Sequence, residues 1–539
     1  MILDAKERER IVKQARELFR AGKVDYAAAM PVLRQGAALG DEWCLCTLGW
    51  CCEFGQGTEL DLQQAKWLYQ QAAEKGFAPA QCNLAVLYIT GSGMVADAVQ
   101  GVYWLKKSAA QNYPRAQYLM GCMYQDGKGV EEDPVQAAKY FTHAAFQGYA
   151  AAQFSLGVCY ERGRGVERNF ETALHQYLLA AEQNHISAIY NAGYFYEMGL
   201  GTEQNLEKAA ECYQKAADAG DADGQCSLAW CYDTGTGVER DSQKAVALYE
   251  KAANQGHLRA MHNLAWCYRL GQAGADGADR KEKAVALFRR AAEQGYVSSI
   301  CDLGVCYQEG WGIEQDLQKA LELYHQAADC GLGKAMNCIG ECFWNGEGVE
   351  QDLNQALEWF EKGAKAGHPE AQFNAAWFWD EGLTGEKDSA KAVHWYSKLL
   401  EQKLPSRECW INGVNNLGEC YRYGRGVEKD LNRAIELYVI SGRCGNDMAW
   451  FNLGHLYETE KEDPKTAAAY YQKGIDECER GGDCALALAL LHEKGLGVEQ
   501  SDAKALQLAH LALDRAMEDQ QVIEDATDLV KRLEKHLQK

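Results

Sequence analysis

Proline is scarce in this chain, and long apolar runs are missing from it. Only 7 of the 539 residues are prolines, which favours helix, because proline lacks a backbone N–H donor and disrupts helix interiors. No window approaches the roughly 18 consecutive apolar residues of a membrane-spanning helix. The amino terminus, Met-Ile-Leu-Asp-Ala-Lys-Glu-Arg-Glu-Arg, is charged where a secretory signal needs an apolar core. These absences predict a helical, cytoplasmic protein without membrane insertion, although an effector translocated by a dedicated secretion system would carry no such signal.

Positive charge is also in short supply. The chain has 55 Lys and Arg against 77 Asp and Glu, which gives a formal net charge of −22. Nucleic acid is therefore excluded as the main ligand, because phosphate binding needs a basic face. An acidic surface attracts a basic protein partner, but it also keeps a protein soluble, and both explanations stay open.

Catalytic and metal-binding signatures are absent from the sequence as well. The recurring Gly-x-Gly-Val lacks the Lys-Ser/Thr of a phosphate-binding loop, and no Gly-x-Ser-x-Gly elbow occurs. His492 and Glu493 have no second histidine at metalloprotease spacing. Cys330, Cys338 and Cys342 form no Cys-x-x-Cys pair. We therefore expect no enzyme activity, no cofactor and no metal.

What the chain does have is one phrase repeated along most of its length. The copy from Ala152 to Val166 reads Ala-Gln-Phe-Ser-Leu-Gly-Val-Cys-Tyr-Glu-Arg-Gly-Arg-Gly-Val. Its opening small residue recurs about every 36 residues, at Cys44, Ala80, Ala116, Ala152, Ala188, Gly224 and Ala260. Later copies open at Ser299, Ala335, Ala371, Gly413, Ala449 and Cys484. Such a period predicts a stack of small units with one continuous surface.

The copy that opens at Gly224 indicates how each unit folds. Leu228 and Cys231, at offsets four and seven from the opening residue, share one face of a first helix. The Gly-Thr-Gly-Val segment at 235–238 ends that helix, because glycine adopts the left-handed conformation of a helix end. Asp241 then provides an N-cap carboxylate for a second helix. Each unit is therefore predicted to be a helical hairpin.

Two features of the second helix recur in the other copies. The cap position holds Asp61, Asp97, Asp133, Asn169, Asn205, Asp316, Asp352, Asp388 and Asp430. A core position, Tyr249 in the copy above, holds Tyr69, Phe141, Tyr177, Tyr213, Tyr324, Phe360, Tyr396 and Tyr438.

Many of the 21 cysteines also follow the repeat. Offset seven is cysteine in Cys51, Cys159, Cys231, Cys267, Cys306, Cys342 and Cys420. Cysteines five residues apart on one helix, such as Cys226 and Cys231, point to different faces and are poorly placed to form a disulfide. We therefore interpret most of the cysteines as small buried apolar residues in a reducing compartment.

The phrase resembles the Sel-one-like repeat, a relative of the tetratricopeptide repeat. The resemblance rests on small-x-x-x-Leu-Gly-x-x-Tyr, Gly-x-Gly-Val, Asp-x-x-x-Ala and Tyr-x-x-Ala-Ala, which recur in about thirteen copies over residues 42–515. It implies an all-α fold, an α/α superhelical solenoid of helix-turn-helix repeats, and usually a scaffold or adaptor role between proteins. In some secreted bacterial members a disulfide links the two helices of each repeat. This chain lacks such a regular pairing of first-helix and second-helix cysteines.

The two ends of the chain differ from the repeats. Residues 1–41 contain a charged helix and then Tyr26 to Leu39, which resembles a degenerate second helix. The stretch from Leu506 to Lys539 is predicted to be helical and is richer in charge, as expected where one side of a stack meets water. We therefore expect an N-terminal cap over 1–41, a solenoid over 42–515 and a C-terminal capping helix over 516–539.

A ligand is expected in the inner groove of the stack. If offsets zero, four, seven and eight of a first helix face the core, then offsets two, three, six, nine and ten point away from the second helix. The glycine at offset five, as in Gly157, Gly193 and Gly304, is expected to face the neighbouring repeat. The resemblance to tetratricopeptide-related repeats implies peptide binding in this groove.

Two residue types recur at the groove offsets. Offset three is asparagine in Asn83, Asn191, Asn263, Asn374, Asn416 and Asn452. Offset six is aromatic in Trp50, Tyr194, Trp230, Trp266 and Trp377. Asparagine can both donate to and accept from an extended peptide backbone, and Trp and Tyr carry much of the binding energy at interfaces. Together with Arg269, at offset nine near Trp230 and Trp266, these residues are the predicted partner-binding set.

Both residue types also have a plainer explanation. The asparagines could hydrogen-bond within the stack, and the tryptophans could pack against the next repeat. His185, His257 and His368 end second helices, where a cation suits the helix dipole.

Glutamates two residues before the cap position predict an acidic ridge along the loops. They are Glu59, Glu131, Glu167, Glu203, Glu239, Glu314, Glu350, Glu386, Glu428 and Glu499. Such a ridge either favours helix starts and solubility or steers a basic partner.

The sequence thus predicts a non-catalytic scaffold or adaptor that binds a protein or peptide segment along the groove. The alternative is a regulatory or sensor subunit that recognises a small ligand, or a cell-wall or peptide fragment, in the same groove.

Overall fold

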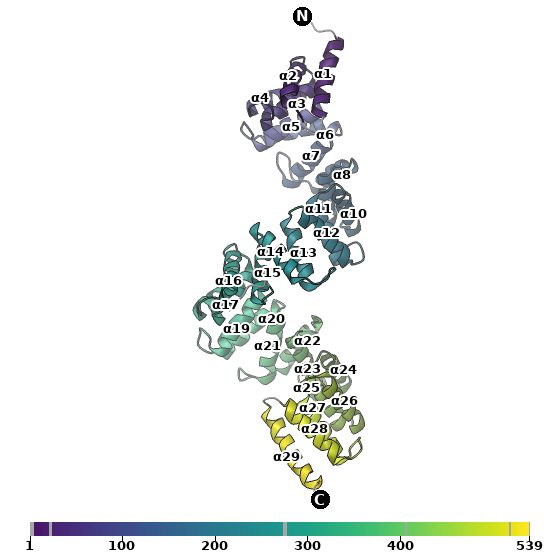
Figure 1. Cartoon of the computed structure of the whole chain (residues 1–539), viewed down its shortest axis with the longest axis vertical. Helices are drawn as coiled ribbons and strands as arrows, with labels where there is room; N and C mark the ends of the chain where they lie inside the picture. The colour runs from purple at the N-terminus through teal and green to yellow at the C-terminus, as the bar shows by residue number, and fades with distance from the viewer. Residues whose placement is uncertain (1–4, 21–23, 273–276, 405–406, 517–518, 538–539) are drawn as a thin grey trace. The chain divides into compact units, whose positions relative to one another are not determined.

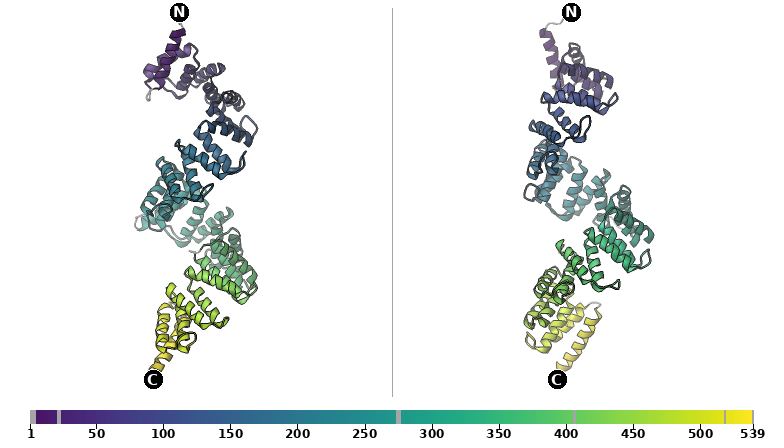
Figure 2. Two further views of the ribbon diagram at one scale, coloured as in Figure 1. Left: turned by 90° about the vertical axis from the view of Figure 1, so that its right-hand side faces the viewer. Right: turned by 180° about the vertical axis from the view of Figure 1, so that it is seen from behind.

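The structure, a computed structural model, describes residues 5–20, 24–272, 277–404, 407–516 and 519–537 (Figure 1). These residues form 29 α-helices and contain no strand. The chain divides into two compact units, residues 1–267 and 268–539. Within each unit, helical hairpins follow one another along the chain (Figure 2), which confirms the predicted all-α, α/α superhelical solenoid. The charged amino terminus, from which no secretory signal was predicted, begins with residues 1–4, and these four lie outside the described residues.

The helices have the following bounds. The first unit contains α1 (Ala5–Arg20), α2 (Tyr26–Ala38), α3 (Glu42–Phe54), α4 (Leu62–Glu74), α5 (Ala78–Thr90), α6 (Ala98–Ala110), α7 (Pro114–Asp126), α8 (Pro134–Phe146), α9 (Ala150–Arg162), α10 (Phe170–Ala181), α11 (Ile186–Met198), α12 (Leu206–Asp218), α13 (Ala222–Thr234), α14 (Ser242–Asn254) and most of α15 (Leu258–Arg269). The second contains α16 (Gly277–Glu293), α17 (Val297–Glu309), α18 (Leu317–Asp329), α19 (Gly333–Asn345), α20 (Leu353–Lys365), α21 (Pro369–Glu381), α22 (Ser389–Glu401), α23 (Glu408–Tyr423), α24 (Leu431–Arg443), α25 (Asp447–Thr459), α26 (Pro464–Glu477), α27 (Gly482–Lys494), α28 (Asp502–Arg515) and α29 (Gln520–Leu537).

The odd-numbered helices α3 to α27 are the first helices of the hairpins, and the even-numbered helices α4 to α28 are the second. Asp241 caps α14 as predicted, because its Oδ1 accepts from the Lys244 N–H at 3.0 Å. Gly235 ends α13 in the left-handed conformation, with φ of 75°. The same cap and helix-ending glycine recur through the array, so local sequence signals set the hairpin boundaries.

The core of each hairpin forms around the aromatic residue of the second helix. Tyr249 is buried, and so are the equivalent rings of the other units: Tyr69, Phe141, Tyr177, Tyr213, Tyr324, Phe360, Tyr396 and Tyr438. Alanines surround them and allow the two helices to approach closely. The cysteines at offset seven are buried in the same layer, and burial raises the pKa of Cys231 to about 12. All 21 cysteines of the chain are free thiols in the structure.

The glycine at offset five faces its own hairpin, so the expectation that it faces the neighbouring repeat was wrong. A Cβ built on Gly157 in α9 would lie 2.6 Å from the Tyr177 ring in α10. Gly193 and Gly304 meet Tyr213 and Tyr324 in the same way. The missing side chain therefore makes room for the buried ring of the second helix.

Gly157→Ala is expected to destabilise its hairpin by about 1–2 kcal/mol. The added methyl overpacks the Tyr177 ring at a cost of roughly 1–3 kcal/mol, which outweighs the gain of about 0.5–1 kcal/mol in helix propensity. Hydrogen exchange of the α9 and α10 amides measures the effect locally. A double variant with Tyr177→Leu should recover part of the loss, whereas additive losses would contradict this contact.

A buried glutamine joins successive hairpins, and the sequence analysis did not identify it. Gln81, at offset one of α5, donates its Nε2 to the Ala73 carbonyl of α4 at 3.0 Å. Its Oε1 accepts from the Gln111 Nε2 at the end of α6, at 2.8 Å. Equivalent pairs of contacts are made by Gln153, Gln225 and Gln372. Since both ends of the amide are satisfied, this polar side chain can stay buried between three helices.

His185 caps the start of a first helix, which corrects its interpretation as a cation at the end of a second helix. Its Nδ1 accepts a hydrogen bond from the Ala188 N–H of α11 at 3.3 Å, so this nitrogen carries no proton. The ring stacks on Phe154, with centroids 4.8 Å apart. Burial lowers the pKa of His185 below its ordinary value of 6.5.

This histidine should make the first unit less stable in weak acid. Because the folded state holds the neutral ring, its contribution is complete above pH 6.5 and is lost as the pH falls below that value. Asparagine caps a helix equally well and does not titrate. His185→Asn should therefore reduce the loss of unfolding free energy between pH 7 and pH 5, as followed by urea titration at each pH. An unchanged pH profile would show that His185 does not contribute.

Candidate partner-binding surface

The first helices of successive hairpins contact one another, as α3 contacts α5 and as α19 contacts α21. Not all of the groove offsets point away from the second helices: Glu161, at offset nine of α9, accepts from the Tyr177 hydroxyl of α10, and the offset-two residues Cys82 and Cys226 are buried. The side chains at offsets two, three, six, nine and ten nevertheless all belong to the first helices. We call the surface that they form the first-helix face. All of the candidate residues predicted from the sequence belong to it by position.

The offset-six aromatic residues differ in how much of each ring is accessible. Trp50 is 39% exposed, Tyr194 is 41% exposed and Trp230 is 40% exposed. Trp266 and Trp377 are half-buried. Large aromatic side chains exposed to this extent leave apolar area for a partner to cover.

These rings also differ in their place in the stack and in their neighbours. Tyr194, Trp230 and Trp266 occupy the same offset on the consecutive first helices α11, α13 and α15. Trp50 lies on α3 and contacts Phe54 of the same helix, with centroids 5.5 Å apart. Trp377 on α21 contacts Trp344 on α19, with centroids 5.4 Å apart. The row from α11 to α15 is therefore the longest stretch of the predicted aromatic set.

The offset-three asparagines make hydrogen bonds within the stack. Asn83 Oδ1 accepts from the Arg115 guanidinium at 2.8 Å. Asn191 lies beside the Tyr177 hydroxyl, which donates to Glu161. Asn263 Nδ2 donates to the Tyr249 hydroxyl at 3.2 Å. The remaining three behave alike: Asn374 bonds Asn337, Asn416 bonds Tyr396, and Asn452 bonds Asn415.

These contacts favour the structural explanation of the asparagines. The bonds of Asn263 and Asn416 reach the buried tyrosine of the preceding second helix, and those of Asn374 and Asn452 reach the preceding first helix. Such bonds satisfy buried hydroxyls and amides that would otherwise lose water. The prediction that the asparagines hold a peptide backbone therefore has less support than the prediction that the aromatic residues bind a partner.

Arg269 is occupied within the second unit. Its Nη2 donates to both carboxylate oxygens of Glu309, at 2.8 and 2.6 Å. The guanidinium also lies 5.1 Å from the centroid of the Trp311 ring. An arginine that is already paired with a carboxylate and an aromatic ring has little capacity left for a partner.

The ten glutamates of the predicted acidic ridge are all exposed. Their helix-capping neighbours, such as Asp241, engage the backbone, while the glutamates themselves point to solvent. This surface is therefore available to attract a cationic partner at long range.

Within the described residues there is no cluster of three or more His, Cys, Asp or Glu side chains suited to a metal. None of the helices that the structure describes is long and apolar enough to cross a bilayer.

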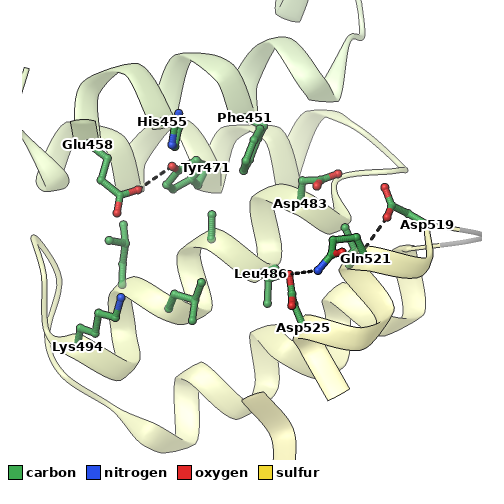
Figure 3. A pocket seen from close by; sticks show the side chains of 14 residues that line it. Phe451, His455, Glu458, Tyr471, Asp483, Leu486, Lys494, Asp519, Gln521 and Asp525 are labelled. Atoms are coloured by element: carbon green, nitrogen blue, oxygen red, sulfur yellow. Dashed lines mark hydrogen bonds between the residues drawn. The ribbon is translucent and has the colours of Figure 1, made fainter. Parts of the chain in front are cut away.

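A cavity of about 440 Å³ lies on the first-helix face of the second unit (Figure 3). We call it the C-terminal cavity. It is lined by Phe451, His455 and Glu458 of α25, by Tyr471 of α26, by Asp483, Leu486, Ala487, Leu490, Leu491 and Lys494 of α27, and by Asp519, Gln521, Val522 and Asp525 at and within α29.

The sequence analysis did not identify these residues, although a signal for them exists. Phe451, His455 and Glu458 stand at offsets two, six and nine of their repeat. Leu486 and Leu490 stand at offsets two and six of the next. Candidates were chosen by residue type as well as by offset, so positions that carry leucine or histidine were passed over. The contribution of α29 follows no repeat and was not predictable from the periodicity.

Comparison with known proteins agrees with this architecture. A family profile described as Sel1 repeat matches residues 45–77, 78–113, 114–149, 150–185, 186–221, 222–257, 258–296, 297–332, 333–368, 369–404, 412–446, 448–477 and 482–516. One similar solved structure is the crystal structure of a protective antigen of uropathogenic Escherichia coli with an SLR fold, whose sequence is 31% identical to this chain. It superposes with a TM-score of 0.61, over 95% of this chain and 97% of that one.

Two further relatives are similar over shorter stretches. A Sel1 repeat protein from Oxalobacter formigenes is 33% identical over 46% of this chain and 96% of its own, with a TM-score of 0.42. An ERAD-associated E3 ubiquitin-protein ligase component from Arabidopsis thaliana is 37% identical over 62 residues, which are 11% of this chain. The match spans only 10% of the length of that plant protein.

Proposed function

Because this chain belongs to the Sel1 repeat family, we propose that it is a non-catalytic scaffold or adaptor that binds a segment of a partner protein along its first-helix face. The fold is of a type that is common among protein–protein interaction scaffolds. The unpaired, buried thiols suit a reducing compartment such as the cytoplasm.

The observation that carries this proposal is the row of offset-six aromatic rings on α11, α13 and α15, of which the first two are exposed. Tyr194 and Trp230 keep about two fifths of their surface exposed, whereas the aromatic residues at the Tyr249 position of the second helices are buried. Exposed Trp and Tyr side chains in series supply large apolar anchors with a polar tip, which is the usual composition of an interface centre.

Site-specific cross-linking tests the proposal. A photo-reactive amino acid at position 230 should cross-link a partner in stoichiometric amounts, because this position lies within the aromatic row. The same amino acid at position 251, on the exposed side of the second helix α14, is the matched control and should give little product. Equal yields at both positions, or no product at either, would overturn the proposed binding face.

A further inference from the structure

The C-terminal cavity has an apolar wall that stays partly exposed among the residues that the structure describes. Leu486, Ala487 and Leu490 of α27 are only half-buried, as is Phe451 of α25. Val522 of α29 also lines the cavity and is buried. A volume of about 440 Å³ falls within the usual range for ligand sites, roughly 300–1,000 Å³. This wall can therefore accept a bulky apolar side chain.

Negative charge collects at one end of the same cavity. Asp483 of α27 lies there with Asp519 and Asp525, and Lys494 lies at the opposite end (Figure 3). Burial and the nearby carboxylates of Asp519 and Asp447 raise the pKa of Asp483. Carboxylates that destabilise one another in this way favour a cation placed between them.

The carboxylates at this end retain room for a cation. Asp519 Oδ1 accepts from the Val522 N–H at 3.1 Å, and Asp525 Oδ2 accepts from Gln521 Nε2 at 3.0 Å. Both donors are neutral groups, so the bonds leave the negative charge uncompensated. A lysine or arginine side chain would supply the missing charge and several donors.

We propose that the C-terminal cavity binds a partner segment that carries a bulky apolar side chain beside a lysine or arginine. The apolar side chain packs on Leu486 and Leu490, and the basic side chain pairs with Asp483 and Asp525. At the other end Lys494 lies together with Glu458, whose opposite charge offsets it, so the excess of negative charge stays at the Asp483 end and favours the basic side chain there (Figure 3). This inference rests on the proposed scaffold function and specifies the chemistry of one partner segment.

A library of random twelve-residue peptides displayed on phage, selected on the full chain, tests this proposal. The enriched peptides should place an apolar residue next to a basic one. Their synthetic copies should bind the double variant Asp483→Asn/Asp525→Asn about tenfold more weakly, since this loss of about 1.4 kcal/mol lies within the up to about 1 kcal/mol that each of two partly exposed ion pairs contributes. Asp528→Asn is the matched control on the same helix; Asp528 pairs with Lys531 and does not line the cavity, so affinity should change less than about twofold.

A second variant separates loss of charge from loss of space. Ala487→Trp fills the cavity while keeping every carboxylate, and it should abolish peptide binding. Both variants are compared with the wild type by circular dichroism, so that a folding defect in one leaves the other as the test. Enrichment of peptides without the basic residue, no enrichment at all, or binding that both variants preserve would overturn the proposal. If the peptide results are negative while cross-linking at position 230 still captures a partner, only the cavity inference fails and the scaffold function stands.

Discussion

Trp450→Ala is expected to destabilise the second unit by about 3–5 kcal/mol, the usual cost of removing a buried tryptophan side chain. Trp450 of α25 has no exposed surface and stacks on Tyr470, with centroids 6.1 Å apart. The surrounding helices pack closely against this ring, so they cannot easily move in to fill the cavity that its removal leaves. Urea titration should show a lower midpoint for the second unit, and hydrogen exchange should show reduced protection of α24 to α26.

The room for this tryptophan comes from two glycines. Gly442 of α24 and Gly474 of α26 replace alanines that most second helices have at the equivalent positions. A Cβ built on Gly442 would lie 2.6 Å from the Trp450 ring, and one built on Gly474 would lie 2.5 Å from Cys484 Sγ and 3.1 Å from the Trp450 Cβ, so the second glycine makes room for both side chains. One large residue therefore fills volume that two small ones release, which is why its removal is costly.

Trp67→Ala is the matched control for this experiment. Trp67 lies on the second helix α4 and is 59% exposed, so the same substitution removes little buried area. Its effect should stay below about 1 kcal/mol. A loss at Trp450 as small as the loss at Trp67 would contradict the packing described here.

The second large effect is expected at the aromatic row. Trp230→Ala with Trp266→Ala should weaken binding of the partner captured by cross-linking at position 230 by about 100-fold or more, because interface tryptophans often contribute about 2 kcal/mol or more each. Helicity should be unchanged for Trp230→Ala, whose ring is 40% exposed. Isothermal titration calorimetry measures the binding, and circular dichroism monitors the helices.

The same pair of variants also tests the alternative role of these rings. Trp266 is half-buried, so its replacement should lower the melting temperature more than the replacement of Trp230. Loss of the helical signal in either single variant would show that the ring belongs to the core. Full binding by the double variant would remove both residues from the partner-binding surface.

Much of the hairpin geometry was predictable from the sequence. The Asp241 cap, the Gly235 helix end and the buried Tyr249 all follow from signals within one repeat. Repetition in register strengthened each of these predictions, because an error in one copy would have to recur in all the others. The candidate surface was predictable only as a set of offsets.

What escaped prediction depends on neighbouring helices. Gly157 faces Tyr177 of its own hairpin, although helical spacing alone allowed the opposite direction. The cap made by His185 depends on where the next helix begins. The asparagines meet side chains of preceding or following helices, and the C-terminal cavity needs α29, which belongs to no repeat.

Periodic spacing, capping residues and composition were thus enough to establish a stack of helical hairpins and its register, since those properties arise within about 36 adjacent residues. The choice between buried and accessible side chains on the first-helix face required the packed helices. Side chains at one offset differ in exposure, as Trp230 and Trp266 do, because each contacts a different set of residues from the hairpins on either side.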